Sequence, residues 1–147
     1  MSMRLMVADA DQSILERCER YSSLKGISLR TATGGIECLA ELRRWFPDVL
    51  VLDMHLPWGG GDGVLSVMRE DDLLARIPVV VLDRSADGGV GPGRFPANVV
   101  GRLVKPLDVD TLFDSACSAA DCREALPQQP YSRRGRGPAA RQAFANG

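Results

Sequence analysis

The sequence has a single histidine, His55, and no CxxC spacing among its cysteines. No partner that would orient His55 as a general base is evident in the sequence. A pair of nucleophile and base is not evident either, so we do not expect an enzyme such as a hydrolase. Four isolated cysteines indicate neither a zinc site nor a disulfide framework. We interpret them as buried, reduced thiols of a cytoplasmic protein: Cys18, Cys38, Cys117 and Cys122.

Long apolar runs and an excess of basic charge are also missing. The apolar runs are too short to cross a membrane and the N-terminus lacks a signal-peptide pattern, so neither insertion nor export is expected. Of the 18 basic residues, four lie after Pro127 in a stretch without acids: Arg133, Arg134, Arg136 and Arg141. Removing these four leaves 14 bases against 19 acids, a net charge of −5 for residues 1–126. This acidic body argues against direct DNA binding by the domain.

The length and composition fit one folded domain. A chain of 147 residues with 45% hydrophobic content can close a single core. We predict that residues 1–126 form this domain. Residues 127–147 contain mainly Gln, Pro, Gly, Arg and Ala without a periodic apolar face, which predicts a disordered basic tail.

The most informative stretch is Val49–Leu52, which Asp53 follows. Four consecutive apolar residues predict a strand buried on both faces, because a half-buried strand would alternate apolar and polar residues. Further strands are expected at 5–8, 27–32, 78–82 and 99–104. Charged residues follow three of them, namely Asp9, Asp83 and Lys105.

Helical periodicity separates most of these strands. Ser13 and Glu16 form a capping-box pattern that predicts a helix to about residue 24, and a second helix must stop by Phe46 because Pro47 follows. A third helix is expected from about residue 62, with Leu73 on its apolar side. A last helix should start at Asp108 or Asp110 and end near residue 125. Residues 87–96 hold too much glycine and proline for a helix, so a loop is predicted there.

The alternation of strands and helices predicts an α/β fold with a doubly wound, five-stranded parallel sheet and helices on both faces. The natural strand order is 2-1-3-4-5. It brings Asp9, Asp11 and Asp53 to one crevice, with Asp83 and Lys105 on its other flank. Clustered carboxylates repel one another unless a cation intervenes, and Mg²⁺ with oxygen ligands is the simplest one. Lys105 could hold an anion attached to Asp53.

Residues 3–125 resemble a receiver domain of the bacterial response-regulator family. The shared features are the acidic end of the first strand, Asp53 followed by Met54-His55-Leu56-Pro57, Asp62-Gly63, Ile77-Pro78 and Lys105-Pro106. The resemblance implies a flavodoxin-like fold and a role in two-component phosphorelay signalling. It implies that Asp53 is the phospho-acceptor and that Lys105 contacts the acyl phosphate. It also implies that Asp9, Asp53 and the backbone carbonyl of His55 hold Mg²⁺.

The sequence departs from the family at three positions and in one longer segment. Ala10 stands where the family has the acid that binds the metal directly, which predicts weak Mg²⁺ binding. Asp83 stands at the position of the switch hydroxyl, and Arg102 at that of the switch aromatic. Residues 87–96 replace a fourth helix that belongs to the usual output surface. These departures put switching by phosphorylation in question.

Two interpretations of the site follow. In one, Asp83 pairs with Lys105 and the chain is a pseudo-receiver; in the other, Asp83 or Asp11 supplies the missing metal ligand and phosphorylation survives. Three functions compete: a stand-alone receiver phosphorylated by a histidine kinase or phosphotransfer protein, a phosphorylation-independent interaction module, and a small phosphate- or nucleotide-binding protein. Output would pass through an effector protein, and the sequence leaves a homodimer open.

Overall fold

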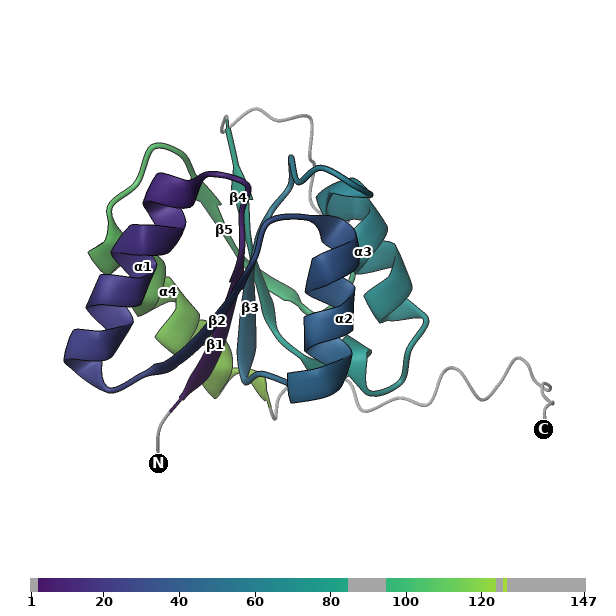
Figure 1. The fold of residues 1–147 in the computed structure, drawn as a ribbon. Coiled ribbons are helices and arrows are strands. Elements are labelled where there is room, and N and C mark those ends of the chain that lie inside the picture. Colours follow the sequence, from purple (N-terminus) through teal and green to yellow (C-terminus); the bar gives the residue numbers. More distant parts are fainter. Residues whose placement is uncertain (1–2, 85–94, 124–125, 127–147) are drawn as a thin grey trace, which may run out of the picture.

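The computed structural model describes residues 3–84, 95–123 and 126, which form one parallel sheet with helices on both sides (Figure 1). The strand order is β2-β1-β3-β4-β5, so the predicted doubly wound α/β fold is confirmed. The strands are β1 (Arg4–Ala8), β2 (Ser28–Ala32), β3 (Val49–Asp53), β4 (Val79–Asp83) and β5 (Val99–Val104). The helices are α1 (Gln12–Lys25), α2 (Gly35–Trp45), α3 (Gly60–Arg69), the short 3₁₀ helix η1 (Leu74–Arg76) and α4 (Val109–Asp121).

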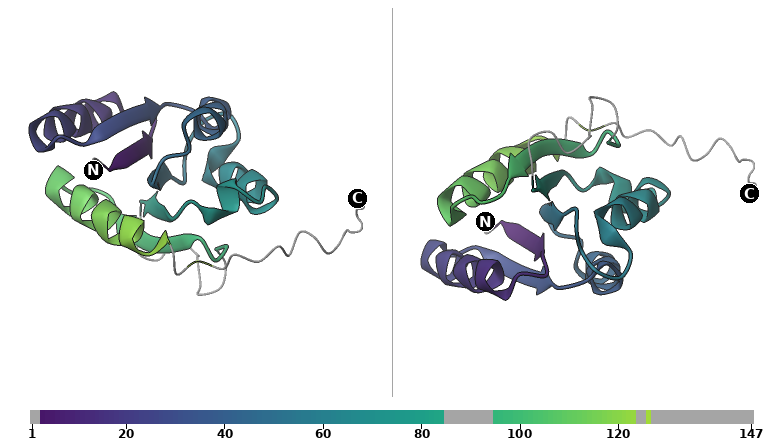
Figure 2. Two further views of the ribbon diagram at one scale, coloured as in Figure 1. Left: turned by 90° about the horizontal axis from the view of Figure 1, so that it is seen from below. Right: turned by 90° about the horizontal axis from the view of Figure 1, so that it is seen from above.

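The helices divide between the two faces of the sheet, as the end-on views show (Figure 2). α1 and α4 pack on one face, where Leu5 and Val7 of β1 point. α2 and α3 pack on the other face, against Met6 and Ala8 of the same strand. Successive side chains of a strand therefore serve opposite cores, as the pleat requires. This alternation also decides which charged residues meet at the strand ends.

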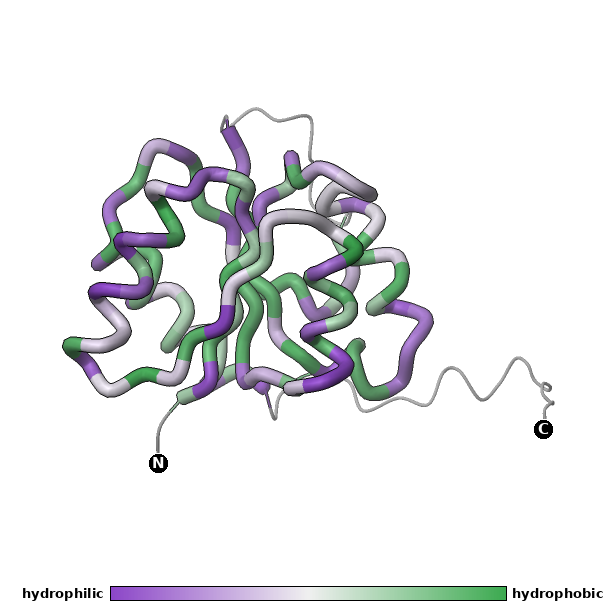
Figure 3. The backbone as a smooth tube through the Cα atoms, viewed as in Figure 1, coloured by the Kyte–Doolittle hydropathy of each residue, from purple (hydrophilic) through white to green (hydrophobic). Residues whose placement is uncertain are grey.

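The central and edge strands differ as their sequences predict. All five residues of β3 and of β4 are buried, because helices cover both faces of these strands. β2 lies at one edge, where exposed and partly buried residues alternate up to Ala32. The hydropathy of the chain follows the same division, with apolar residues concentrated in the middle of the sheet (Figure 3).

Several helix boundaries differ from the predicted ones. The N-cap of α1 is Asp11, whose Oδ1 accepts a hydrogen bond of 2.9 Å from the backbone N–H of Ser13, so the predicted capping box of Ser13 and Glu16 is wrong. α3 begins at Gly60, and Leu73 lies beyond this helix with 56% of its surface exposed. Asp108 caps α4, which ends at Asp121.

The four cysteines are free, but only two are buried. Burial raises the pKa of the Cys18 thiol to about 11 and that of Cys38 to about 12, so both stay protonated at neutral pH. Cys117 is exposed and Cys122 is partly buried, so the prediction of buried thiols is wrong for this pair. Cys117 lies within α4 and Cys122 directly follows this helix.

Two predictions lie outside the described residues. They are most of the predicted loop at 87–96, because the description stops at residue 84 and resumes at 95, and the basic tail at 127–147. Among the described residues, none of the helices combines the length and apolar character needed to span a bilayer.

Candidate functional site

Three charged side chains meet at the carboxyl ends of β1, β3 and β5. The ammonium nitrogen of Lys105 lies 2.8 Å from Oδ2 of Asp9 and 3.6 Å from Oδ2 of Asp53. We call Asp9, Asp53 and Lys105 the acceptor cluster. Ligand sites of open α/β sheets lie at this edge, so the three side chains lie where the sequence predicts the chemistry, and their roles stay a prediction.

The two carboxylates of the acceptor cluster are deeply buried. Asp9 is 1% exposed and Asp53 is 2% exposed. Burial raises the pKa of Asp9, and the adjacent Lys105 ammonium and the hydrogen bond from the backbone N–H of Asp11 only partly offset this effect. The backbone N–H of His55 donates to Oδ1 of Asp53 over 3.1 Å. Each carboxylate thus has one oxygen held by a backbone donor and one facing Lys105.

An open pocket of about 640 Å³ lies above these carboxylates. The described residues lining it include Asp11 from the start of α1, so the predicted convergence of Asp9, Asp11 and Asp53 on one pocket is found. The Asp11 carboxylate, however, caps α1. The hydrogen bond from Ser13 N–H lowers its pKa, so Asp11 stays charged while serving the helix end.

The loop between β3 and α3 brings its backbone close to the strand end. The backbone N–H of Gly61 donates to the carbonyl of Met54 over 3.2 Å. A Cβ on Gly61 would lie 2.7 Å from Cα of Met54, so only glycine fits there. The loop also holds Trp58 in a left-handed conformation with 75% of its surface exposed.

The oxygen atoms available in the described residues form a poor ligand set for Mg²⁺. The residues that the resemblance assigns to the metal offer two carboxylates, Asp9 and Asp53, and the backbone carbonyl of His55, while Ala10 offers no side-chain oxygen. Lys105 already lies within hydrogen-bond distance of Asp9. In the described part of the chain, no group of three or more His, Cys, Asp or Glu side chains could hold a metal ion. The set is consistent with the predicted weak binding, which stays a prediction.

A second group of charges lies beside the first. Oδ2 of Asp83 is 3.3 Å from Nη2 of Arg102, and Oδ1 is 3.6 Å from Nε2 of His55. We call Asp83, Arg102 and His55 the switch-position cluster. Burial alone would raise the pKa of Asp83, but the hydrogen bonds from the backbone N–H of Arg84 and from Arg102 outweigh it and lower the pKa.

The predicted pair of Asp83 and Lys105 is therefore wrong. Asp83 is the sheet partner of Val104, and Arg102 lies two residues before Val104, so Asp83 and Arg102 share one face of the sheet. Lys105 is one residue further and points to the other face, toward Asp9 and Asp53. Only the backbones of Asp83 and Lys105 are bonded, with the Lys105 N–H donating to the Asp83 carbonyl over 2.8 Å.

Sequence analysis missed two basic residues of the pocket, Arg17 and Arg84. Arg84 directly follows β4, so its place after a strand end was a signal that could have been used. Arg17 lies one turn after Ser13 in α1, and the periodicity alone did not distinguish it from an ordinary solvent-exposed helix residue.

Comparison with protein families agrees with this geometry. Residues 5–116 match the response regulator receiver domain. The chain belongs to this family. The resemblance inferred from Asp53, Lys105 and the surrounding motifs is confirmed, and the chain is a receiver domain of two-component signalling.

Known proteins show how far the likeness extends. The chain is 37% identical over 115 residues to the response regulator MprA of Mycobacterium bovis, which covers 77% of this chain and 48% of MprA. It is 32% identical over 106 residues to the transcriptional regulatory protein PrrA of Mycobacterium leprae, covering 72% of this chain and 45% of PrrA. The chain thus spans about half the length of these relatives.

Among solved structures, a putative response regulator from Chloroflexus aurantiacus superposes with a TM-score of 0.73 at 24% identity. The match covers 82% of this chain and 99% of that one. At this identity the likeness supports the receiver fold, and the roles of individual residues must come from the site itself.

Proposed function

We propose that this receiver domain accepts a phosphoryl group on Asp53 and passes the signal on through protein contacts. The observation that carries the proposal is the acceptor cluster, in which a buried Asp53 carboxylate at the base of an open pocket faces Lys105 at 3.6 Å. An ammonium group there can neutralise phosphoryl oxygens as they arrive. No catalytic activity beyond this self-phosphorylation is proposed.

The proposed donor is a histidine kinase or a phosphotransfer protein, and the proposed receiver of the signal is an effector protein. These are the partners that the family implies, and a cytoplasmic location is proposed with them. Direct DNA binding by the domain is not proposed, because its body is acidic.

Phosphorylation can be tested by incubating the protein with acetyl phosphate and Mg²⁺ and measuring its intact mass. We expect a mass increase of one phosphoryl group that Asp53→Asn abolishes. Asp114→Asn is the matched control, because Asp114 is an exposed carboxylate on α4, away from the pocket, and this variant should be labelled like the parent protein. Labelling that persists in Asp53→Asn would contradict the proposal.

A second candidate function is a phosphorylation-independent interaction module. The ion pair of Asp83 and Arg102 favours it, because these charges stand where the family has a switch hydroxyl and a switch aromatic. A protein of this kind would remain unlabelled under the same conditions. Its partner would also bind the parent protein and the Asp53→Asn variant with equal affinity.

A further inference from the structure

The pocket above Asp53 contains more positive charge than the acceptor cluster alone supplies. Its described lining has three carboxylates, and Arg17 and Arg84 join Lys105 to give three cationic side chains. The two arginines come from different elements, α1 and the segment directly after β4. Positive charge therefore borders the pocket from separate parts of the fold.

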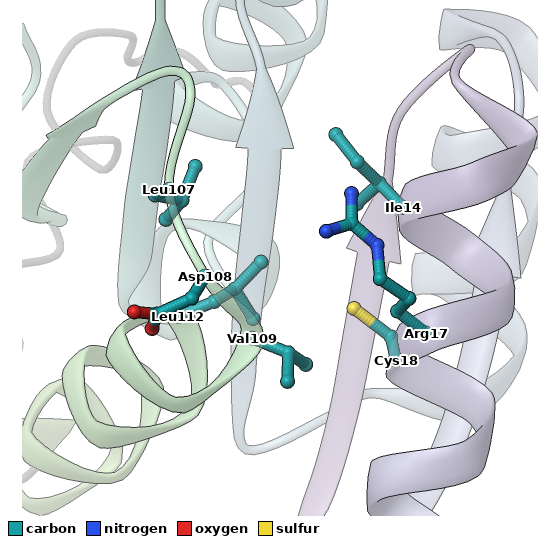
Figure 4. A pocket seen from close by; sticks show the side chains of 7 residues that line it. All are labelled: Ile14, Arg17, Cys18, Leu107, Asp108, Val109 and Leu112. Carbon is teal, nitrogen blue, oxygen red and sulfur yellow. The ribbon is translucent and has the colours of Figure 1, made fainter.

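Arg17 also lines a small neighbouring pocket between α1 and the start of α4, drawn in Figure 4, where its guanidinium lies beside Ile14 and across the gap from Leu107 and Asp108. Its Nε donates to the backbone carbonyl of Ser13 over 3.3 Å, at the first turn of the helix. This bond uses a single N–H of the guanidinium, which has five. Within residues 3–84, 95–123 and 126, no hydrogen bond or ion pair engages its terminal nitrogens, which can therefore bind a ligand of the pocket.

Arg84 directly follows β4 and lines the pocket. Its N–H donates to Oδ1 of the preceding residue, Asp83, over 2.8 Å at the end of β4. Among the described residues, the guanidinium groups of Arg17 and Arg84 form no ion pair with a carboxylate, whereas Arg102 is paired with Asp83. A guanidinium without a carboxylate beside an open pocket is suited to binding an anion, because its planar fork matches phosphate oxygens.

We propose that Arg17 and Arg84, together with Lys105, form an anion site that holds phosphoryl oxygens in place of a divalent cation. The inference rests on the proposed function, and it explains how the pocket could work with a poor set of metal ligands. Ala10 removes one negative charge from the pocket, and the arginines add two positive charges. The charge that a metal ion would bring is thus supplied by side chains.

The chemical step needs no further reactant. With acetyl phosphate as donor, an oxygen of the Asp53 carboxylate forms a bond to phosphorus. The bond from phosphorus to the bridging oxygen breaks, and acetate leaves with the electron pair. No proton is transferred, and the guanidinium and ammonium groups neutralise the phosphoryl oxygens throughout.

The first test is binding of inorganic phosphate to protein in EDTA, measured by calorimetry. We expect binding to the parent protein and a rise of at least about tenfold in the dissociation constant for a variant carrying both Arg17→Ala and Arg84→Ala. Arg20→Ala is the matched control, because Arg20 lies on the same helix outside this pocket. Circular dichroism verifies that each variant is folded. Phosphate binding that requires Mg²⁺, or that the double variant leaves unchanged, would overturn the inference.

The second test compares the rates of labelling by acetyl phosphate in EDTA and in Mg²⁺. The parent protein should be labelled in EDTA within about threefold of its rate in Mg²⁺, and the double variant should lose at least about tenfold in EDTA. Labelling that stops in EDTA would overturn the inference and leave Asp53 as the acceptor. Arginine-dependent phosphate binding without labelling in either condition would support the anion site and overturn the proposed function.

Discussion

The acceptor cluster and the switch-position cluster lie side by side at the carboxyl ends of the strands, yet they differ in how far they match the family. In the acceptor cluster, Asp53 and Lys105 match the family and lie close together around buried carboxylates. In the switch-position cluster, both family positions are substituted and the new residues, Asp83 and Arg102, pair with each other. The two steps proposed for this protein, acceptance of a phosphoryl group and the response to it, thus depend on separate sets of side chains.

The pleat of the sheet accounts for this separation. The side chains of the acceptor cluster face the same side of the sheet as α1 and α4. Each of them lies two residues after an apolar residue of that core: Asp9 after Val7, Asp53 after Val51, and Lys105 after Leu103. Asp83 and Arg102 lie on the opposite face. In the described structure His55 links the two clusters, with its backbone on Asp53 and its imidazole near Asp83.

The largest effect is expected from Lys105→Met, which removes the cation of the acceptor cluster. The free energy of unfolding at pH 7 should fall by about 2 kcal/mol, because two buried carboxylates lose their counter-charge. We set this below the cost of breaking a fully buried pair because the Lys105 side chain is 19% exposed. Urea denaturation measures the change.

Lys25→Met is the control, since Lys25 is the other lysine of the chain and lies at the end of α1. Adding Asp9→Asn to Lys105→Met should restore part of the lost stability. A Lys105→Met protein as stable as the parent would show that the acceptor cluster is more hydrated than its burial indicates.

The fold and the convergence of Asp9, Asp11 and Asp53 on one pocket could be predicted because both rest on local patterns. The continuous apolar runs of β3 and β4 identify central strands, and the strand order then follows from the connections. Asp53 ends β3 and Lys105 directly follows β5, so the topology places both residues at the same end of the sheet. The positions of these residues needed no knowledge of side-chain rotamers.

The pairing of charges could not be predicted with the same reasoning. The distance between strand ends allows Lys105 to reach either Asp83 or Asp53. Only the alternation of side chains, continued past the last residue of each strand, places the two carboxylates on opposite faces of the sheet. Asp83 and Arg102 carried a usable signal, because two opposite charges replace two family positions on neighbouring strands. The cap of α1 was missed for a different reason, since Asp11 competes with Ser13 for the same helix end.

The next effect concerns the influence of the switch-position cluster on the acceptor. Asp83→Thr should raise the labelling of Asp53 by acetyl phosphate about tenfold. A second carboxylate about 4 Å from a phosphoryl oxygen would cost up to ~4 kcal/mol at an effective dielectric near 20, and Arg102 offsets much of this. Intact-mass measurement over time gives the rate.

Asp83→Asn is the isosteric comparison, because it removes the charge without providing a hydroxyl, and it should give most of the gain. Unchanged labelling in both variants would mean that the two clusters do not interact through charge. The two clusters would then act independently of each other.

A smaller effect is expected from Asp9→Asn and should depend on pH. The pKa of Asp9 is raised by burial, so the folded state binds its proton more readily than the unfolded state does. Its charged form therefore destabilises the fold as the pH rises above the ordinary range for Asp. The variant should be more stable than the parent at pH 7, by on the order of 1 kcal/mol, and equally stable near pH 3. A difference that does not change with pH would contradict the assignment.

The smallest effect tests whether the switch-position cluster stabilises the fold independently. In a double-mutant cycle, Asp83→Asn and Arg102→Gln should show a coupling energy of about 0.5–1 kcal/mol at pH 7, because the pair is only partly buried. The folded-state pKa of Asp83 is lowered, so this stabilisation is present above the ordinary Asp pKa and is lost as the pH falls through the folded value. The same cycle between Asp83→Asn and Lys105→Met should be additive, since these side chains face opposite sides of the sheet. Strong coupling between Asp83 and Lys105 would join the two clusters into one network, and no coupling between Asp83 and Arg102 would contradict a stabilising role for their ion pair.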